Sequence, residues 1–387
     1  MGDRPISRIL AAVSATALLA AACGQAAAPS AAPTVAATTA PTTAPTTAPT
    51  PTKAPAAYKQ VGTINITPKD TASFDVGIVD PSTHTYYLAD RTTKGVDIIQ
   101  NEKYVKTVSG MVGAAAKSDD SGPNGLILVP DKDQIWAGDG DSTVKVVDLK
   151  TDTIVGTITT GGKHRADEGA YDPKDHVVMI ANDAEDTPFV TFISSTDQKV
   201  LGKLDFQGAG GLEESFFDST NGVFWLSIPT SKTNKEGSVV QVDPKSMKVT
   251  KTYVEKGCES NGIEPGPNNV LLLVCNSDAI KDGFKASTQF MDLKSGNVLG
   301  SVPAGGGDLA VYDSSTGDFL VADSNMTSDG TKAGKAAPAL VVIDGAKMSL
   351  LAQIPTAKSS HSIAIDTSNH HIYVPVPNKG IWIFAAQ

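Results

Sequence analysis

A pattern that recurs seven times between residues 58 and 387 restricts this chain to very few folds. The recurring pattern is an apolar strand, a turn at Asp-Pro or an equivalent, a strand ending in a small or acidic residue, and a β-branched strand that commonly ends in Asp. The first copy reads VGIVDPSTHTYYLAD and the third reads GAYDPKDHVVMIAND. The repeat averages about 47 residues, close to the length of a four-stranded propeller blade. No segment has sustained helical periodicity. We therefore predict an all-β fold, a seven-bladed β-propeller of four-stranded antiparallel blades.

The two ends of the repeat region complement each other. Each of the first six copies continues into a fourth, outer strand, whereas the seventh stops at GIWIFAAQ. At the other end, Val61-Gly62-Thr63-Ile64 repeats the outer-strand sequence Val155-Gly156-Thr157-Ile158. We predict that this N-terminal strand pairs with the last blade and closes the ring, which removes free sheet edges.

Two segments, DPKDHVVMIANDA and STVKVVDLKTDTIVGTI, carry a family resemblance. Over residues 58–387 the chain resembles the YVTN family of seven-bladed β-propellers. The resemblance implies the same fold. It implies little about activity, because members of that family mostly lack an assigned reaction.

The N-terminus has the composition of an export signal. Arg4 and Arg8 precede an apolar run too short to span a bilayer, which ends in small residues at Cys23. This junction resembles a bacterial lipobox. We predict a signal peptide over 1–22, lipidation of Cys23, and attachment outside the cytoplasm, at the cell surface or in the periplasm. The alternative is plain secretion after cleavage at an A-x-A site.

Residues 23–57 are almost entirely Ala, Pro, Thr and Ser, so we expect a disordered linker between Cys23 and the propeller of 58–387. The formal net charge is −10 and no Lys/Arg cluster occurs, which argues against a nucleic-acid partner. No second apolar stretch is long enough to span a membrane. We expect a monomer that contacts the membrane only through its lipid.

Aligning the copies on the turn after their first strand brings out a set of acidic positions. The turn residues are Asp80, Pro130, Asp172, Asp218, Glu264, Asp313 and Asp366. Five positions earlier stand Asp75, Gly125, Asp167, Glu213, Glu259, Asp308 and His361. The first strand of each blade lines the central channel, so equivalent positions meet around its mouth. We predict an acidic collar there, flanked by His164, Glu168, Glu214 and Asn261.

Charges so close together need compensation. Two like charges ~4 Å apart at an effective dielectric of ~20 repel by ~4 kcal/mol. Raised pKa values, separation across a water-filled channel or a bound cation would relieve the repulsion. Oxygen ligands with one imidazole suit a hard divalent ion, Ca²⁺ more than Mg²⁺ or Mn²⁺. The alternative is a solvated acidic funnel without a specific site.

Two further features belong to the same end of the channel. The loops between the second and third strands are long in blades four, five and six, and long loops on a rigid scaffold are common binding sites. Cys258 and Cys275 flank the turn at 264–269, and folding this hairpin about its midpoint pairs them. We predict a disulfide that fixes Glu259.

Three hypotheses for function follow. The first is a non-catalytic binding module that holds a small ligand, a metal ion or a protein partner at the channel mouth. The second is a metal-dependent hydrolase resembling the lactonase and gluconolactonase propellers. That resemblance makes Asp167, Glu213, Glu259 and Asp308 candidate metal ligands, and His361 or Glu168 the candidate base. The third is a structural envelope or adhesion protein in which the collar has no role.

Overall fold

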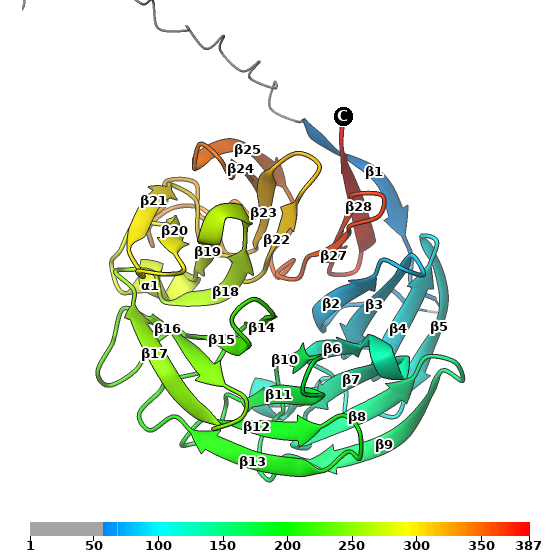
Figure 1. The fold of residues 1–387 in the computed structure, drawn as a ribbon. Coiled ribbons are helices and arrows are strands. Elements are labelled where there is room, and N and C mark those ends of the chain that lie inside the picture. The colour runs from blue at the N-terminus through cyan, green and yellow to red at the C-terminus, as the bar shows by residue number, and fades with distance from the viewer. Residues whose placement is uncertain (1–56, 68) are drawn as a thin grey trace, which may run out of the picture. The chain divides into compact units, whose positions relative to one another are not determined.

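The computed structural model describes residues 57–67 and 69–387, and within them seven four-stranded antiparallel sheets form a ring (Figure 1). The predicted signal peptide, Cys23 and nearly all of the linker lie outside the described residues. Blades one to three comprise β2 (Phe74–Asp80), β3 (Thr85–Asp90), β4 (Gly95–Gln100), β5 (Lys103–Ser109), β6 (Leu126–Val129), β7 (Gln134–Asp139), β8 (Thr143–Asp148), β9 (Thr153–Thr159), β10 (Gly169–Asp172), β11 (Val177–Asn182), β12 (Phe189–Ser194) and β13 (Val200–Asp205).

Blades four to seven repeat the arrangement, and the seventh uses the first strand of the chain. They comprise β14 (Ser215–Asp218), β15 (Val223–Ile228), β16 (Ser238–Asp243), β17 (Lys248–Val254), β18 (Ser260–Pro265), β19 (Val270–Cys275), β20 (Thr288–Asp292), β21 (Val298–Val302), β22 (Ala310–Asp313), β23 (Asp318–Asp323), β24 (Ala339–Asp344), β25 (Ser349–Pro355), β26 (Ala364–Asp366), β27 (His371–Val376), β28 (Gly380–Ala386) and β1 (Tyr58–Ile64). The seven-bladed all-β prediction is confirmed.

The hydrophobic core is divided into clusters that lie between successive blades. The described residues form seven such clusters, one for each blade-to-blade interface. The two middle strands of each blade supply most of these side chains, including Trp136 and Trp225, which are fully buried. Outer strands such as β9 alternate between exposed and half-buried residues, because only one of their faces packs on a neighbour.

The ring closes as the sequence predicted. Strand β1 pairs antiparallel with β28, from Tyr58 opposite Ala386 to Ile64 opposite Ile381. The Tyr58 hydroxyl also donates a hydrogen bond of 2.7 Å to Oδ2 of Asp313, at the hairpin turn of blade six. Strand β1 therefore both completes blade seven and contacts its neighbour.

The ring has two different faces. We call the face with the hairpins that join first and second strands the turn face; Asp80, Asp172 and Asp313 lie there. The opposite face, where the first strands begin, is the collar face. The long loops of blades four, five and six, residues 229–237, 276–287 and 324–338, belong to the collar face. The contact between Tyr58 and Asp313 places the start of β1 at the turn face.

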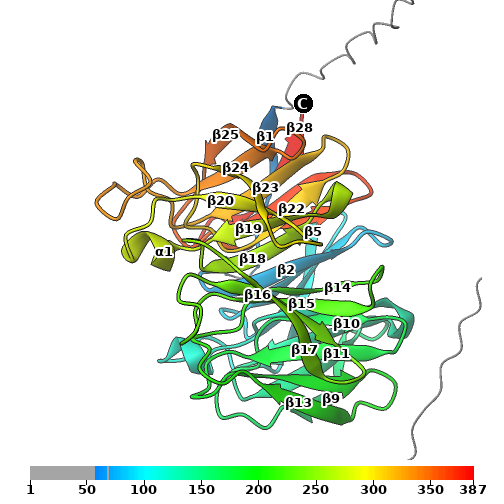
Figure 2. The ribbon, with the colours of Figure 1, turned by 60° about the vertical axis from the view of Figure 1, so that its left-hand side comes forward.

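Helical structure is minor. The loop of blade five contains the one α-helix of the described residues, α1 (Ser277–Lys281). Figure 2 shows α1 and the loop between β23 and β24 projecting on the same side of the ring. Within the part of the chain that the structure describes, no helix has the length and apolar character needed to cross a membrane.

The contact between Tyr58 and Asp313 predicts a stability difference. Tyr58→Phe removes a donor from a fully buried carboxylate, and hydrogen bonds to charged groups contribute roughly 1.5–3 kcal/mol. We expect the free energy of unfolding, measured by denaturant titration, to fall by about 2 kcal/mol. The control is Tyr104→Phe, which loses a bond to Thr107 on the less buried β5. Equal losses in the two variants would contradict this role.

Candidate functional site

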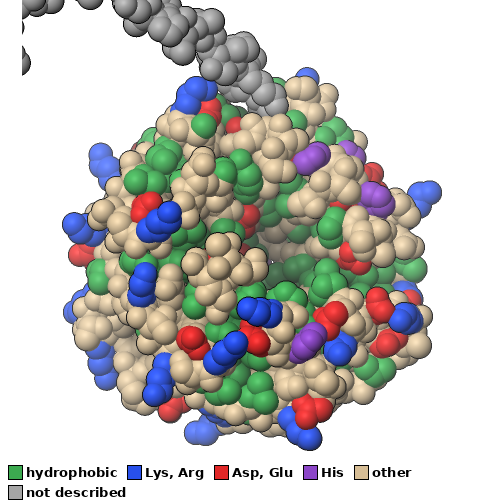
Figure 3. Space-filling view, viewed as in Figure 1, with side chains coloured by type: hydrophobic (Ala, Val, Ile, Leu, Met, Phe, Trp, Pro, Cys, Tyr) green, Lys and Arg blue, Asp and Glu red, His purple; other side chains and the backbone are tan. Residues whose placement is uncertain are grey.

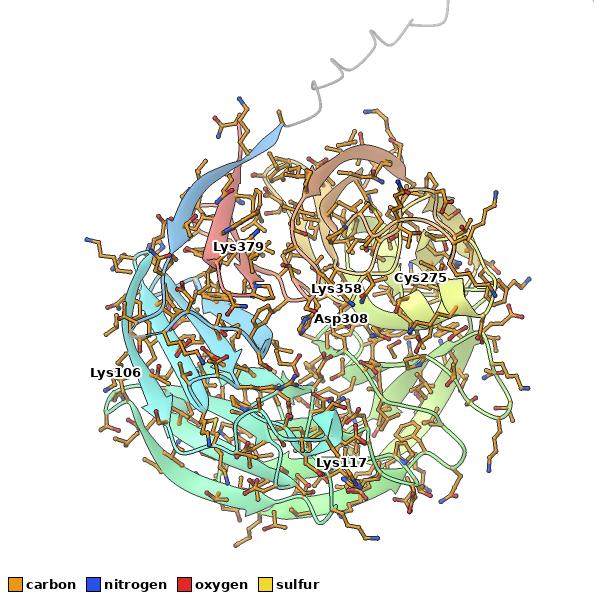
Figure 4. The ribbon with its side chains drawn as sticks, turned by 180° about the vertical axis from the view of Figure 1, so that it is seen from behind. Lys106, Lys117, Cys275, Asp308, Lys358 and Lys379 are labelled. Atoms are coloured by element: carbon orange, nitrogen blue, oxygen red, sulfur yellow. A yellow bond between two sulfur atoms is a disulfide. The ribbon has the colours of Figure 1, made fainter. Side chains whose placement is uncertain are left out.

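Most of the predicted collar residues come together around the axis. His361 and Asp75 are 286 positions apart, yet Nε2 of His361 lies 3.2 Å from Oδ1 of Asp75. The carboxylates of Asp75, Asp167, Glu213 and Asp308 are close enough for their charges to shift one another's pKa values. Figure 4 labels Asp308 close to the centre of the ring.

Blade two contributes no side chain to the collar. A Cβ at Gly125 would lie 2.3 Å from the backbone oxygen of Asp167, so only glycine allows blades two and three to approach this closely. The gap in the acidic pattern at Gly125 is therefore a packing requirement.

Glu259 differs from the other members. The charged residues that raise its pKa are Asp282, Asp278 and Glu236, which belong to the long loops of blades four and five. Its backbone has a left-handed φ of 48°. The side chain therefore faces the loop wall of the collar, away from the charges around the axis.

Two arginines, which we did not predict as part of the site, compensate much of the acidic collar. The Arg91 guanidinium contacts Asp75 and also bonds Oδ1 of Asn124, at 3.1 Å from Nε. The Arg165 guanidinium lies 2.8 Å from Asp167 and 2.6 Å from Asp183. Their rarity in the sequence could have indicated this role, because Arg91 and Arg165 are the only arginines in residues 58–387. Bidentate pairing with carboxylates favours arginine over lysine.

His361 is held as an imidazolium. Its Nδ1 faces the backbone oxygen of Ser359 at 3.0 Å, and its Nε2 faces Asp75. Both partners are acceptors, so both ring nitrogens carry protons. Burial, the largest influence, works against this charge, but the hydrogen bond to Asp75, the charges of Asp308 and Asp75 and the hydrogen bond to Ser359 together raise the pKa of His361. Phe74 stacks on the ring, with centroids 5.2 Å apart.

The carboxyls of the collar divide into two groups by pKa. Burial alone would raise the pKa of Asp75, but the charge of Arg91 and the bond from His361 lower it to about 2. Burial raises the pKa of Glu213 and Asp308, and the charge of Asp308 raises that of Glu213 further. Burial and the charges of Asp282 and Asp278 raise the pKa of Glu259 to about 7. Burial also raises the pKa of Asp167, although Arg165 pairs with it. Asp75 is thus the ionised member, while the other collar carboxyls have a high affinity for protons.

The predicted flanking residues have different positions. Asn261 joins the collar, because its Nδ2 donates to Asp308 at 3.0 Å. Glu168 and Glu214 line a separate, smaller cavity of about 150 Å³ along the channel. There Oε2 of Glu214 accepts from the backbone N–H of Ile263 in blade five, at 2.6 Å. Glu214 therefore links two blades.

The placement of His164 beside the collar is wrong. Its Nδ1 lies 2.8 Å from Asp120 of the preceding blade connection, and its backbone N–H donates to Glu185. Burial is slight, and the hydrogen bond to Asp120 raises the pKa of His164. His164 does not line the collar cavity, whereas the adjacent Arg165 pairs with the collar residue Asp167.

The collar opens into a cavity of about 520 Å³. Its lining includes Arg91, Glu213, Glu259, Asn261, Asp308 and His361. The long loops form one wall through Pro229, Thr230, Asn276, Ser277, Asp278, Ser324 and Asn325. The space-filling view from the turn face also shows the centre of the ring hollowed (Figure 3).

The predicted Ca²⁺ site is not supported by a ligand set. In residues 57–67 and 69–387, no group of three His, Cys, Asp or Glu side chains lies close enough to hold one metal ion. Ca²⁺ takes about 6–8 oxygen ligands. The arginines have taken two of the carboxylates, and Glu259 faces away from the rest. The collar residues as placed therefore do not fit this ion.

The predicted disulfide between Cys258 and Cys275 is present. The expected direct pairing of the two residues across the hairpin is wrong, because Cys275 lies opposite Ser260 and a bulge follows between Ser260 and Gly262. Cys258 precedes β18, and its Cα is 4.4 Å from that of Cys275. The disulfide fastens the residue next to Glu259 to the end of β19.

Comparisons with known proteins identify the fold. No protein-family model matches the sequence, and no curated protein does. In contrast, 1660 chains of solved structures match the fold. The WD40 β-propeller domain of Doa1 matches with a TM-score of 0.60 and 13% identity, covering 85% of this chain and 97% of that one. Hydrazine synthase of Kuenenia stuttgartiensis matches with a TM-score of 0.64 and 12% identity, covering 81% and 96%. At such identities only the propeller architecture is shared.

Arg165 gives a prediction for stability. Arg165→Gln leaves Asp183 and Asp167 without their cation in a buried setting, and removing one partner of a buried ion pair costs about 3–5 kcal/mol. We expect a loss of about 3 kcal/mol in the free energy of unfolding. The control Lys163→Gln, two residues earlier and exposed, should stay within about 0.5 kcal/mol of wild type. A similar small change for Arg165→Gln would show that the collar does not need this cation.

Glu264 predicts how stability depends on pH. Burial raises the pKa of Glu264 to about 8, so the folded state keeps a proton that the unfolded chain has lost. Its stabilising contribution is complete below the unfolded pKa and disappears as pH rises through the folded pKa. Wild type should therefore lose stability between about pH 5 and about pH 8. Glu264→Gln keeps an oxygen that accepts from Tyr312 and does not titrate, so its loss over this range should be smaller. Identical pH profiles would contradict the assignment.

Proposed function

We propose that this protein is a lipid-anchored binding protein of the bacterial cell exterior that holds a small ligand in the collar cavity and catalyses no reaction. The observation that supports binding is the cavity itself. A volume of about 520 Å³ is within the range of roughly 300–1,000 Å³ common for small-ligand sites. It lies on the rigid ring, and three long loops form its wall.

The state of His361 favours binding over hydrolysis. A general base needs a lone pair, and both ring nitrogens of His361 face acceptors. Glu168, the other candidate base, lies in the smaller cavity, where burial raises its pKa well above the ordinary value. The described residues also lack a three-ligand cluster for the metal that such a hydrolase would use.

The path of the chain is consistent with an anchored binding protein. Strand β1 begins at the turn face, and the backbone N–H of Gln387 bonds the oxygen of Ala57 at 3.0 Å. The preceding segment therefore joins the propeller on the face opposite the cavity. From the YVTN-like repeats we also propose that the chain belongs to the YVTN family of propellers.

Occlusion of the cavity tests the proposal. Asn325 is exposed on the blade-six loop and lines the cavity, so Asn325→Trp should fill its entrance. A ligand at about 100 times its Kd stabilises a protein by about 2.7 kcal/mol. In a thermal-shift screen of small molecules on the full chain, we expect compounds that raise the Tm of wild type but not of Asn325→Trp.

The control for this screen is Lys332→Trp, which changes an exposed residue of the same loop outside the cavity lining. This variant should respond as wild type does. Compounds that stabilise Asn325→Trp as well as wild type would place binding elsewhere. A screen with no stabilising compound would also count against the proposal.

A further inference from the structure

The polar groups of the collar cavity are unevenly satisfied. The cationic donors are already occupied: Arg91 bonds Asp75 and Asn124, and His361 bonds Asp75 and Ser359. Asn276 donates to Asn261. What remains available to a ligand in this lining is chiefly a set of acceptors.

Glu259 is the clearest case. The residue is only 1% exposed, and its Oε1 is buried without a hydrogen-bond partner among the described residues. It nevertheless lines the cavity. Burying a carboxylate oxygen without a hydrogen-bond donor lowers the stability of the fold, so a ligand that donates to this oxygen would bind favourably.

Glu213 and Asp308 add acceptors at a second point. No protein donor within the described residues reaches the Glu213 carboxylate, and Asp308 receives one bond, from Asn261. The charge of Asp308 raises the pKa of Glu213, whereas the loop residues Asp282 and Asp278 raise that of Glu259. Within the described residues Glu259 also forms no three-residue cluster with Glu213 and Asp308. The cavity therefore has two separate acidic points, one near the axis and one near the loop wall.

Resting on the proposed binding function, we infer that the ligand is a small aliphatic diamine or polyamine, with one ammonium group at Glu259 and another at Glu213 and Asp308. An ammonium group supplies three donors and no acceptor, which complements a lining whose cationic side chains are already paired and whose carboxyls lack donors. Charge-assisted bonds of this kind are among the stronger ones. A bare metal ion fits less well, because the acidic points are separated and no three ligands converge.

The uncharged part of the lining suits the chain between the ammonium groups. Ala72, Phe74 and Pro229 supply apolar surface among the polar residues. Methylene groups bury against such surface favourably, at about 25 cal/mol per Å². Two charges joined by a short hydrocarbon chain therefore match the cavity better than a compact ion or a polyol.

Calorimetric titration of the full chain with putrescine, cadaverine and spermidine tests the inference. We expect these amines to bind wild type at least about tenfold more tightly than butylamine, because the second ammonium adds a charge-assisted contact. Butanediol, which has the same spacing without charge, should show no binding. Glu259→Gln and Glu213→Gln should each weaken diamine binding by about tenfold or more.

Glu102→Gln is the matched control, since it removes one carboxylate from the end of blade one's β4–β5 hairpin, away from the cavity lining. It should bind as wild type does, and thermal melts verify that all variants fold. Equal affinity for mono- and diamines, insensitivity to both collar variants, or Ca²⁺ binding that the collar variants abolish would overturn the inference. If diamines fail while another compound binds wild type but not Asn325→Trp, the diamine assignment falls and the binding function stands.

Discussion

The pairing of β1 with β28 closes the ring and holds all seven blades in position. Six blades are contiguous in sequence, but the seventh has only three strands until the N-terminal strand joins it. Because each apolar cluster is shared between two blades, an unclosed ring would expose two of its faces at the gap. Closure thus fixes the ring geometry, and with it the distance of every first strand from the axis.

That geometry brings acidic side chains close together, and nearby cationic side chains reduce the repulsion between them. Arg91 and Arg165 pair with the carboxylates of blades one and three, and His361 joins Asp75 from blade seven. Among the described residues, no arginine or histidine pairs in this way with the collar carboxyls of blades four, five and six. Their carboxyls keep raised pKa values or remain unpaired, and the long loops lie over the same three blades. The electrostatic asymmetry and the loop wall thus coincide in one sector of the collar.

Acidic side chains near the channel also form hydrogen bonds that connect neighbouring blades. Glu214 accepts from the backbone of blade five, and Glu264 accepts from Tyr312 of blade six. First strands have an edge that faces the channel, so their N–H groups have no strand partner there. A buried carboxyl from the preceding blade satisfies them. An acidic residue near the channel therefore has one of two roles. Where it reaches a backbone N–H of the next blade it is structural, and where it does not it faces the cavity.

Much of the architecture can be read from the order of residues: the blade number, the strand order within each blade and the ring closure by residues 58–64. These follow from periodicity, because a repeated pattern of apolar strands and turns can be buried only by stacking like units. The hairpin between Cys258 and Cys275 likewise indicates their disulfide, and the repeats locate the collar positions along the chain. Which collar residues act together depends on contacts between blades. Arg91 and Arg165 stand in loops of unrelated sequence, His164 contacts Asp120, and the left-handed backbone of Glu259 directs it to the loop wall. Repeat symmetry fixes where a Cα lies around the axis, but the direction and charge of a side chain depend on neighbours from other blades, which no local pattern encodes.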